Sequence, residues 1–365
     1  MNTVIHIVSN KTWGGGEQYV YDLARRQTTE GYRVLVLCRP VDALTGKFRE
    51  LGHLHATLPL KGIADFKSAW AVAQILKTLP EPCLLHVHNF KDAFTAAYAR
   101  CLSHSKTARL VMTRHLVRPA KTSLPYRWLY HQLDWLIFVS DLARREFFSS
   151  NPDICPDRIA VIRPAVVLPR GIEPLDIRRR LGISSDATVA MYHGRLHAEK
   201  GLDTLLHAMT HLCDLPLHVL LVGHGPDDYT SHLRHLAEMH HLADRIHFAG
   251  FQAEVLPYVA AADFGVLPSI VREACPLSAQ EYLSQGRPVV SSNHGGQCEY
   301  LADGSNALLV PPADPTALAD AMRRLTTDTD LRHRLGLQAK ADYDHHLTYD
   351  HFYSQMQHLY QSLGL

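Results

Sequence analysis

The sequence predicts an α/β protein made of two doubly wound domains, each with a parallel sheet covered by helices on both faces. Three observations predict this. The chain has 365 residues, and single cores rarely grow beyond about 250 residues. Short, continuous apolar runs alternate with stretches of helical period along the whole chain. These runs fall into two series, separated by a stretch rich in proline and glycine.

In the first series, short aliphatic and β-branched runs are typical of strands that are buried on both faces. The expected strands are Val4–Val8, Arg33–Cys38, Leu84–His88, Leu110–Thr113, Leu136–Ser140 and Ile159–Ile162. Amphipathic stretches between them predict helices, for example over Glu17–Thr29 and Phe66–Leu79.

The second series repeats this alternation. Its expected strands are Val189–His193, Leu217–Val222, Ile246–Ala249, Phe264–Leu267, Pro288–Ser291 and Leu308–Val310. The boundary between the series lies between Pro164 and Ile177, where three prolines and a glycine interrupt any periodicity. We therefore expect a first domain over residues 1–168 and a second over 169–345. Residues 346–365 should form a C-terminal helix that returns to the first domain.

Charge and cysteine content exclude several classes of protein. The net charge is +1, from 37 basic and 36 acidic side chains, whereas a nucleic-acid-binding protein normally has a basic excess. The 7 cysteines are widely spaced and contain no CxxC pair, so neither a zinc site nor a disulfide framework is indicated. The N-terminus does not resemble a signal peptide and no apolar run reaches about 20 residues. We expect a reduced, cytoplasmic protein.

A glycine-rich turn follows the first expected strand. Trp13-Gly14-Gly15-Gly16-Glu17 directly precedes a helix, and glycines allow a ligand to approach the backbone. The N-terminus of the helix favours an anion such as a diphosphate. The alternative is a plain strand-to-helix turn. The spacing is not GxGxxG, so a dinucleotide is not indicated.

Strand ends of the second domain carry further candidates for binding an anionic ligand. Gly194 and Arg195 follow one strand and Lys200 lies shortly after them, so the two cations could grip a diphosphate from two directions. Alternatively, they are solvated surface charges. Gly223 bends the next strand end, and Phe251 follows another, where it could lie near a base or in the core.

The most specific signal is a pair of glutamates around the start of a helix, in Glu273-Ala-Cys-Pro-Leu-Ser-Ala-Gln-Glu281. Pro276 fits the first turn of a helix, so the amides near Leu277 are free to face an anion. Glu273 would lie in the preceding loop and Glu281 inside the helix. Two carboxylates at two depths suit two sets of sugar hydroxyls, although glutamates eight apart are common.

Taken in order, GGGE, GRL..EKG, VGHGP, E-x7-E, GRPVV and DGSNALLVPP resemble the retaining glycosyltransferases of the family 4 type, which have the GT-B fold of two facing Rossmann-like domains. The resemblance covers nearly the whole chain and is densest over residues 189–319. It implies a hexosyltransferase that moves sugar from a nucleotide diphosphate sugar, with no other cofactor and no metal. The domains would close over the donor and exclude water.

The resemblance also implies roles for single residues. Glu273 would hold the hydroxyls of the donor sugar and Glu281 the ribose diol, while Arg195 and Lys200 neutralise the diphosphate. The loop at Gly15 and Gly16 would close on the diphosphate. Cys275-Pro276 replaces the usual phenylalanine–glycine after the first glutamate and removes one backbone donor, and Ala307 stands where glycine is frequent.

Two histidine positions gain meaning from the same resemblance. His115 matches the residue that the family places beside the reacting carbon, whereas the residues alone suggest a capped loop histidine. His86 and His88 resemble an H-x-H strand end that lines the cleft. Two histidines spaced two apart on one strand face could also bind a metal, but the sequence places no third ligand.

The acceptor is suggested by one basic, aromatic segment. It combines Arg114, Arg118, Lys121 and Arg127 with Leu124, Tyr126, Trp128, Leu129 and Tyr130. Such a helix could rest on an anionic membrane surface and meet a lipid-linked or lipopolysaccharide acceptor, or be an ordinary helix packed on the sheet. The resemblance favours assembly of cell-surface polysaccharide or lipopolysaccharide. The alternatives are a nucleotide-sugar epimerase of the same fold and a non-catalytic nucleotide-sugar-binding module.

Overall fold

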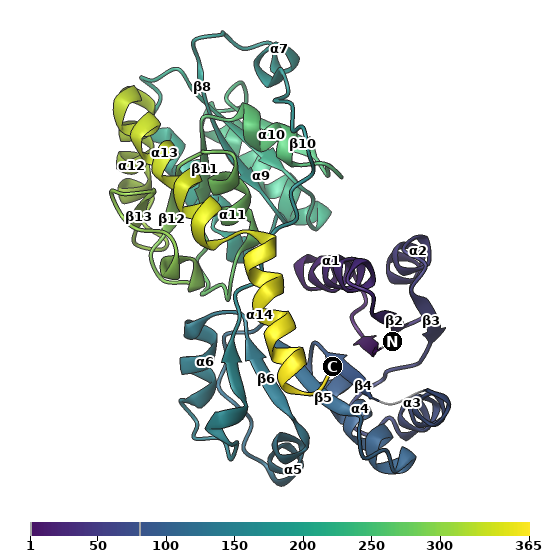
Figure 1. Ribbon diagram of the computed structural model, residues 1–365. Helices are drawn as coiled ribbons and strands as arrows, with labels where there is room; N and C mark the ends of the chain where they lie inside the picture. The colour runs from purple at the N-terminus through teal and green to yellow at the C-terminus, as the bar shows by residue number, and fades with distance from the viewer. Residues whose placement is uncertain (1, 80–81) are drawn as a thin grey trace. The chain divides into compact units, whose positions relative to one another are not determined.

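The computed structural model describes residues 2–79 and 82–365, and the chain divides into two compact units. Unit 1 comprises Met1–Pro164 and Asp350–Leu365, and unit 2 comprises Ala165–Tyr349. Each unit is a parallel sheet with helices on both faces (Figure 1). Every strand pair recorded in the two sheets is parallel, as the continuous apolar runs predict.

Unit 1 has a seven-stranded sheet in the order β3-β2-β1-β4-β5-β6-β7. Its strands are β1 (Thr3–Val8), β2 (Arg33–Cys38), β3 (Leu54–Thr57), β4 (Cys83–Val87), β5 (Arg109–Arg114), β6 (Trp135–Phe138) and β7 (Ile159–Val161). Its helices are α1 (Gly15–Thr29), α2 (Asp42–Glu50), α3 (Phe66–Thr78), α4 (Phe90–Ser103), α5 (Leu124–Gln132), α6 (Asp141–Phe148), the short 3₁₀ turn η1 (Pro156–Arg158) and nearly all of α14 (Tyr349–Ser362).

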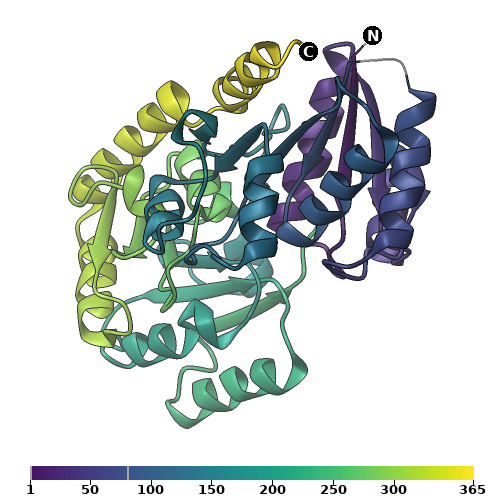
Figure 2. The same ribbon diagram turned by 90° about the horizontal axis from the view of Figure 1, so that it is seen from below.

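Alternating residues of the unit 1 strands face different layers. Ile5 and Ile7 belong to the apolar core formed with α3, α4, α5 and α6. His6, between them, faces the opposite layer, where it contacts Gln27 of α1. The C-terminal helix α14, yellow in Figures 1 and 2, packs on this layer through Tyr360, which contacts both Gln27 and His86. Residues 350–365 therefore complete unit 1, far from its other residues in sequence.

Unit 2 has a six-stranded sheet in the order β10-β9-β8-β11-β12-β13. Its strands are β8 (Thr188–His193), β9 (Leu217–Val222), β10 (Ile246–Gly250), β11 (Phe264–Leu267), β12 (Val289–Ser292) and β13 (Ala307–Val310). Its helices are α7 (Ile177–Leu181), α8 (Leu202–Thr210), α9 (Asp227–Met239), α10 (Leu256–Ala261), α11 (Leu277–Ser284), α12 (Pro315–Thr327) and α13 (Thr329–His346), with 3₁₀ turns η2 (Ala198–Lys200) and η3 (Gly296–Glu299).

Two apolar layers enclose the unit 2 sheet. Helices α8, α9 and α12 cover one face, α10 and α11 cover the other, and α13 contributes buried residues to both layers. Gly265 in β11 lies under the ring of Tyr282 in α11, so closely that a Cβ there would contact the ring atoms at 2.5–2.7 Å. This glycine therefore brings α11 close to the sheet and fixes the depth of the residues that α11 carries.

Candidate functional site

Both sheets have a point where the strand order reverses, and the crevice beyond the carboxyl ends of the strands at such a point is the usual ligand position in open α/β sheets. In unit 2 the reversal lies between β8 and β11, and in unit 1 it lies between β1 and β4. The predicted residues follow these strands or their neighbours. Gly15, Gly16 and His115 belong to unit 1, and the remaining predicted residues belong to unit 2.

The loops after β8 and β9 pack against each other through their backbones. Gly194 donates its amide to the carbonyl of Val222 at 3.0 Å, and a side chain at Gly223 would overlap the Gly194 carbonyl. Gly194 and Gly223 both have positive φ angles, of 142° and 137°. Positive φ angles account for glycine at both positions, and backbone contact adds to the requirement at Gly223. Their contact with a donor remains a prediction.

Lys200 and Glu273 form an ion pair, with 2.6 Å between Nζ and Oε2 and both side chains 21% exposed. The geometry comes from the turn that follows Lys200. Gly201 has a φ of 71°, and a Cβ there would overlap the carbonyl of Pro268, so η2 lies directly against the loop after β11. Ile270 donates its amide to the carbonyl of Glu199 at 3.0 Å. A cation and a carboxylate thus meet at the reversal point of the sheet.

Glu281 is engaged by a histidine that the sequence did not single out. His193, the last residue of β8, lies with Nε2 2.5 Å from Glu281 Oε2 and with Nδ1 2.8 Å from the hydroxyl of Tyr282. Tyr282 donates its only hydroxyl proton to the carbonyl of Met191 at 2.7 Å, so Nδ1 of His193 must donate to Tyr282. Nε2 of the same ring contacts the Glu281 carboxylate. This arrangement fixes one carboxylate oxygen of Glu281.

Arg195 and the start of α11 both provide positive electrostatic potential that no nearby carboxylate or capping side chain balances closely. The Arg195 side chain is 64% exposed, and its nearest carboxylate, that of Glu199, is 4.0 Å away. Helix α11 begins at Leu277 without a side-chain cap, because Pro276 occupies the N-cap position. Pro276 was expected inside the first turn and instead precedes it. The N-terminal amides of α11 consequently lack a capping side chain, which favours an anion there.

Phe251 lies at the surface, so its interpretation as a core aromatic is wrong. It is 67% exposed and follows β10. Its ring centroid is 5.7 Å from that of His224, which follows β9, and the rings meet edge to face. The exposed ring of Phe251 offers an apolar face of the kind on which a base stacks.

The glycines before and within α1 are not required by the turn. None of Gly14, Gly15 and Gly16 has a positive φ, and a Cβ at Gly15 or Gly16 would meet nothing within 4 Å. Gly15 and Gly16 form the first turn of α1, where helix-forming residues are normally preferred. Because neither backbone conformation nor packing demands glycine, open access to the backbone is the remaining physical reason for these residues.

His115 follows β5 and presents a neutral imidazole. Burial lowers its pKa to about 4. Its Nε2 is buried and has no hydrogen-bond partner, and its ring packs edge to face on Tyr19 at 5.0 Å. A capping role, the alternative suggested by the residues alone, would engage ring nitrogens with the backbone. The buried Nε2 instead leaves one hydrogen bond of the ring unmade.

A chain of hydrogen bonds links the histidines of unit 1. His6 pairs with His86 in the β1–β4 register, and His6 Nδ1 lies 3.2 Å from His88 Nε2. The amide oxygen of Gln27 accepts from His6 Nε2 at 2.8 Å, and its amide nitrogen donates to Tyr360 at 3.1 Å. The Tyr360 hydroxyl also lies 2.9 Å from Nδ1 of His86. Gln27 thus links His6 to Tyr360 and, through Tyr360, to His86.

His6 is the third histidine that the sequence did not place beside His86 and His88. One ring nitrogen from each lies within 4.8 Å of the others, a spacing that a metal ion could bridge. The ring nitrogens of His6 and His86 are already engaged by protein groups. Burial lowers the pKa of His88 well below its usual value, and the neighbouring histidines lower it further, so neutral imidazoles joined by hydrogen bonds account for the cluster.

The basic, aromatic segment is divided between core and surface, since four of its nine residues are buried. Arg114 is buried between the rings of Phe90 and Phe147, each 5.0 Å from its guanidinium carbon. Tyr126, Leu129 and Tyr130 are also buried. Arg118, Lys121 and Leu124 remain exposed, so a membrane contact, which stays a prediction, would rest on these. No helix in the described part of the chain is long and apolar enough to cross a membrane.

Sequence comparison assigns both units to known families. Residues 175–342 match the family described as glycosyl transferases group 1, and residues 13–170 match Glycosyltransferase Family 4. Together the two matches span most of both units. The chain therefore belongs to the family 4 type of glycosyltransferases with the GT-B fold, as its motifs predict, and it is a transferase enzyme.

Individual relatives are more distant. The D-inositol 3-phosphate glycosyltransferase of Nocardioides sp. is 28% identical over 89% of this chain and 80% of its own length. The lipopolysaccharide core biosynthesis glycosyltransferase LpsE of Rhizobium meliloti is 34% identical over 43% of this chain, and the match spans 45% of LpsE. The crystal structure of Anabaena Alr3699/HepE in complex with UDP has a TM-score of 0.85 at 20% identity, covering 99% of this chain and 100% of that one.

Proposed function

We propose that the protein transfers a hexosyl group from a nucleotide diphosphate sugar to an acceptor hydroxyl, with retention of anomeric configuration and without a metal ion at the diphosphate. The observation that carries this proposal is the Lys200–Glu273 pair at the reversal point of the unit 2 sheet, with Arg195 exposed on the loop after β8. A cation beside a carboxylate suits a ligand that carries both phosphates and sugar hydroxyls.

In this proposal unit 2 binds the donor. Arg195, Lys200 and the amides at the start of α11 near Leu277 neutralise the diphosphate, and Glu273 accepts from the hydroxyls of the sugar. Glu281, held by His193, accepts from the ribose diol with its free oxygen. The exposed ring of Phe251 stacks on the base. The Anabaena protein, which shares this fold, binds UDP in its crystal structure, and this supports a uridine nucleotide as the donor of the present protein.

The chemical step forms a bond between the acceptor oxygen and the anomeric carbon while the bond from that carbon to the diphosphate oxygen breaks. Attack on the face from which the diphosphate leaves retains the configuration, and the acceptor hydroxyl proton passes to a phosphate oxygen. Negative charge grows on the diphosphate, where fixed cations and amides stabilise it without reorganising. Unit 1 contributes His115, whose neutral Nε2 accepts from a sugar hydroxyl.

The absence of a metal from the proposed step is consistent with how the chain uses its D-x-D triplets, Asp328–Asp330 and Asp342–Asp344. Asp328 caps α13 by accepting the amide of Leu331, and Asp344 pairs with Lys340. Asp342 accepts from Asn306 and Gln338. Asp328, Asp342 and Asp344 thus already have partners on or next to α13.

We also propose that the acceptor is a glycan or lipid-linked sugar of cell-surface polysaccharide or lipopolysaccharide, used in the cytoplasm or at the cytoplasmic face of the membrane. The name of the Rhizobium relative supports this setting. Exposed Arg118, Lys121 and Leu124 provide a small basic and apolar surface on unit 1 for a peripheral contact with anionic lipid.

Thermal shifts with UDP-, GDP- and ADP-sugars, measured in the presence of a chelator, test the donor. A ligand at 100 times its dissociation constant should add about 2.7 kcal/mol to the free energy of unfolding. We expect Lys200→Ala to lose this shift and to lower kcat about a hundredfold. Arg323→Ala is the matched control, because it removes an exposed cation on α12 that pairs with Asp214. It should change neither the thermal shift nor kcat.

Three outcomes would contradict the proposal. A full thermal shift in Lys200→Ala would remove Lys200 from the diphosphate site. NMR of the product distinguishes the reaction type, since an inverted anomeric centre would exclude retention. Formation of an epimer from the donor alone, without acceptor, would indicate the epimerase alternative.

A further inference from the structure

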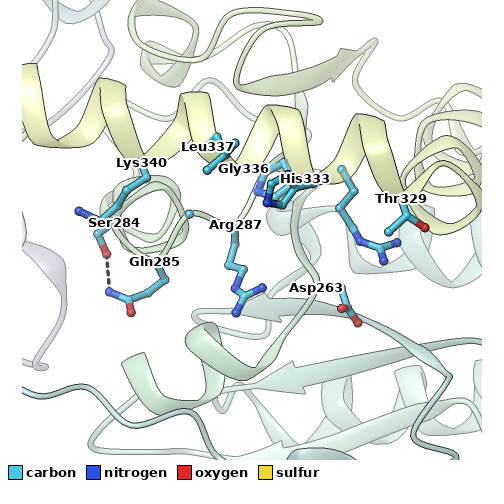
Figure 3. A pocket seen from close by; sticks show the side chains of 12 residues that line it. Asp263, Ser284, Gln285, Arg287, Thr329, His333, Gly336, Leu337 and Lys340 are labelled. Atoms are coloured by element: carbon cyan, nitrogen blue, oxygen red, sulfur yellow. Dashed lines mark hydrogen bonds between the residues drawn. The ribbon is translucent and has the colours of Figure 1, made fainter.

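Unit 2 contains a hollow at the edge of its sheet opposite to the candidate donor residues. The volume is about 520 Å³, within the range of small-molecule sites. Asp263 directly precedes β11 and Arg287 precedes β12 by two residues, so the hollow is at the amino ends of these strands. The candidate donor residues follow the carboxyl ends. Figure 3 shows α13 along one side of the hollow, with Arg287 and Asp263 on the other.

The walls of the hollow are held by close backbone packing. Gly336 of α13 lies against the turn after α11, so closely that a Cβ there would overlap the carbonyl oxygen of Gly286. Ser284 and Gln285, at the end of α11, are joined by a hydrogen bond of 3.0 Å. The hollow is therefore formed by ordered helix ends and not by a mobile loop.

Basic groups outnumber carboxylates around this hollow. Asp263 is committed to Arg178, with 2.5 Å between Oδ2 and Nη2, and the same oxygen accepts the amide of Val189 at 2.7 Å. Arg287 and Arg332 donate to backbone carbonyls, those of Ala260 and of Leu325. In the described part of the chain, neither has a recorded carboxylate within ion-pair distance.

Arg287 shows the imbalance most clearly. Its Nε is buried and has no hydrogen-bond partner. Burial lowers the pKa of the guanidinium, Asp263 opposes this shift, and the positive charges of Arg178 and Arg332 reinforce it. An unpartnered donor on a half-buried cation is unfavourable unless an anion or water reaches it.

Further charges lie at the rim. Lys340 pairs with Asp344 at 2.5 Å, so this pair adds no net charge, and exposed His333 lies about two turns further towards the start of α13. The hollow is thus lined by two guanidiniums, a lysine neutralised by Asp344, a histidine, and Asp263, whose charge Arg178 neutralises from outside the lining. Their sum favours a ligand with about two negative charges, as a phosphate monoester has at neutral pH.

We propose that this hollow binds the phosphate monoester of a small phosphorylated molecule through Arg287 and Arg332. Planar guanidiniums bind phosphate oxygens with paired hydrogen bonds, and the remaining volume accommodates the organic part. Helix α11 connects this site to the candidate donor residues, because it carries Ser284 and Gln285 at one end and Leu277 at the other.

The test uses glycerol 3-phosphate and inorganic phosphate as soluble probes, with the full-length protein at constant ionic strength in chloride buffer. We expect a saturable rise in Tm with glycerol 3-phosphate. Arg332→Gln and Arg287→Gln should each weaken the apparent Kd about ten- to hundredfold, as expected for loss of a hydrogen bond to a charged group. Arg332→Gln on the more open side of the hollow keeps the test valid if Arg287→Gln fails to fold. Arg323→Gln on α12 is the control and should bind normally.

Lys200→Ala separates this site from the donor site, which could also take up phosphate. The response to glycerol 3-phosphate should persist in Lys200→Ala, whatever happens to nucleotide-sugar binding. Vesicles containing phosphatidic acid distinguish a lipid headgroup from a soluble ester. Binding to vesicles that disappears in Arg332→Gln, without a response to soluble probes, would identify the headgroup as the source. Equal responses in the wild type and both arginine variants, or no response to either form of phosphate, would overturn the proposal.

Discussion

The carboxyl edges of the two sheets carry different kinds of side chain. In unit 2, the edge carries polar groups that are already paired: Lys200 forms an ion pair with Glu273, and His193 contacts Glu281. In unit 1, the corresponding edge leads to a row of buried imidazoles, with His115 at its open end. Charged, preorganised groups suit a ligand that gains charge during a reaction. Neutral donors and acceptors suit sugar hydroxyls.

The glycines at the two edges differ in the same way. Gly201 and Gly223 in unit 2 are required by positive φ angles and by contact with neighbouring carbonyls. Gly15 and Gly16 in unit 1 meet neither requirement. Glycine thus serves folding at one edge, whereas at the other its value lies in leaving the backbone accessible. The predictions below test these two contrasts.

The largest expected effect is acid destabilisation of unit 1. Burial lowers the pKa of His6 to about 4, against the hydrogen bond to Gln27 that raises it, and lowers that of His115 to about 4. The unfolded chain takes up protons below its histidine pKa of about 6.5 that the folded chain cannot bind. Stability is therefore full above pH 6.5 and is lost as the pH falls towards 4, by about 2 kcal/mol for each such histidine between pH 6.5 and 5.

Asp92 acts in the opposite direction. Burial raises its pKa to about 7, so the folded chain retains a proton that the unfolded carboxyl releases, and this contribution weakens as the pH rises towards 7. The histidines with lowered pKa values outnumber it, and the net effect is lower stability in acid.

All 4 tryptophans lie in unit 1, at positions 13, 70, 128 and 135, so urea denaturation followed by tryptophan fluorescence reports this unit alone. His6→Gln should flatten the pH dependence. Equal stability of the wild-type protein at pH 7.5 and pH 5 would contradict the predicted acid destabilisation of unit 1.

The second effect concerns Gly201, whose φ of 71° and proximity to the Pro268 carbonyl both disfavour a side chain. We expect Gly201→Ala to lower the free energy of unfolding of unit 2 by about 3 kcal/mol. Gly304→Ala is a matched control, since Gly304 also has a φ of 71° but nothing within 4 Å of its Cβ position. It should cost only about 1 kcal/mol. Circular dichroism melting measures both, and equal losses would mean that backbone contact does not determine this turn.

The sequence predicted most strands because parallel strands buried on both faces appear as continuous apolar runs. Arg33–Cys38, Leu217–Val222 and Phe264–Leu267 have the predicted bounds. The strand Leu54–Thr57 was missed because it lies at the edge of its sheet, where alternate residues are exposed. An edge strand lacks the apolar run on which the prediction depended.

The sequence predicted the parts of the candidate site that short motifs define, but not the contacts between residues far apart in the chain. The glutamate and lysine positions follow from motifs, but their pairing depends on the loop after β11 folding back on η2, over 73 residues of sequence separation. His6 lies 82 residues from His88, and only the parallel register of β1 and β4 brings them together. His193 had one usable signal, its place as the last residue of a strand next to the reversal point.

The smallest expected effect on stability has the clearest consequence for function. Gly16 lies in the first turn of α1 with open space around its Cβ position, so Gly16→Ala should raise the free energy of unfolding of unit 1 by about 0.5–1 kcal/mol. Gly46→Ala in α2, which also has nothing within 4 Å, should stabilise unit 1 similarly and serves as the control.

Activity then separates the two variants. If a ligand approaches the backbone at Gly16, the added methyl group lowers kcat/KM in Gly16→Ala, whereas Gly46→Ala keeps wild-type activity. Tryptophan fluorescence gives the stability of both proteins, and a steady-state transfer assay gives their kcat/KM. Wild-type activity in a stabilised Gly16→Ala would show that the methyl group is tolerated, and the first turn of α1 would then be excluded from the ligand site. A selective loss would indicate that the accessible backbone of unit 1 contacts the substrate during transfer.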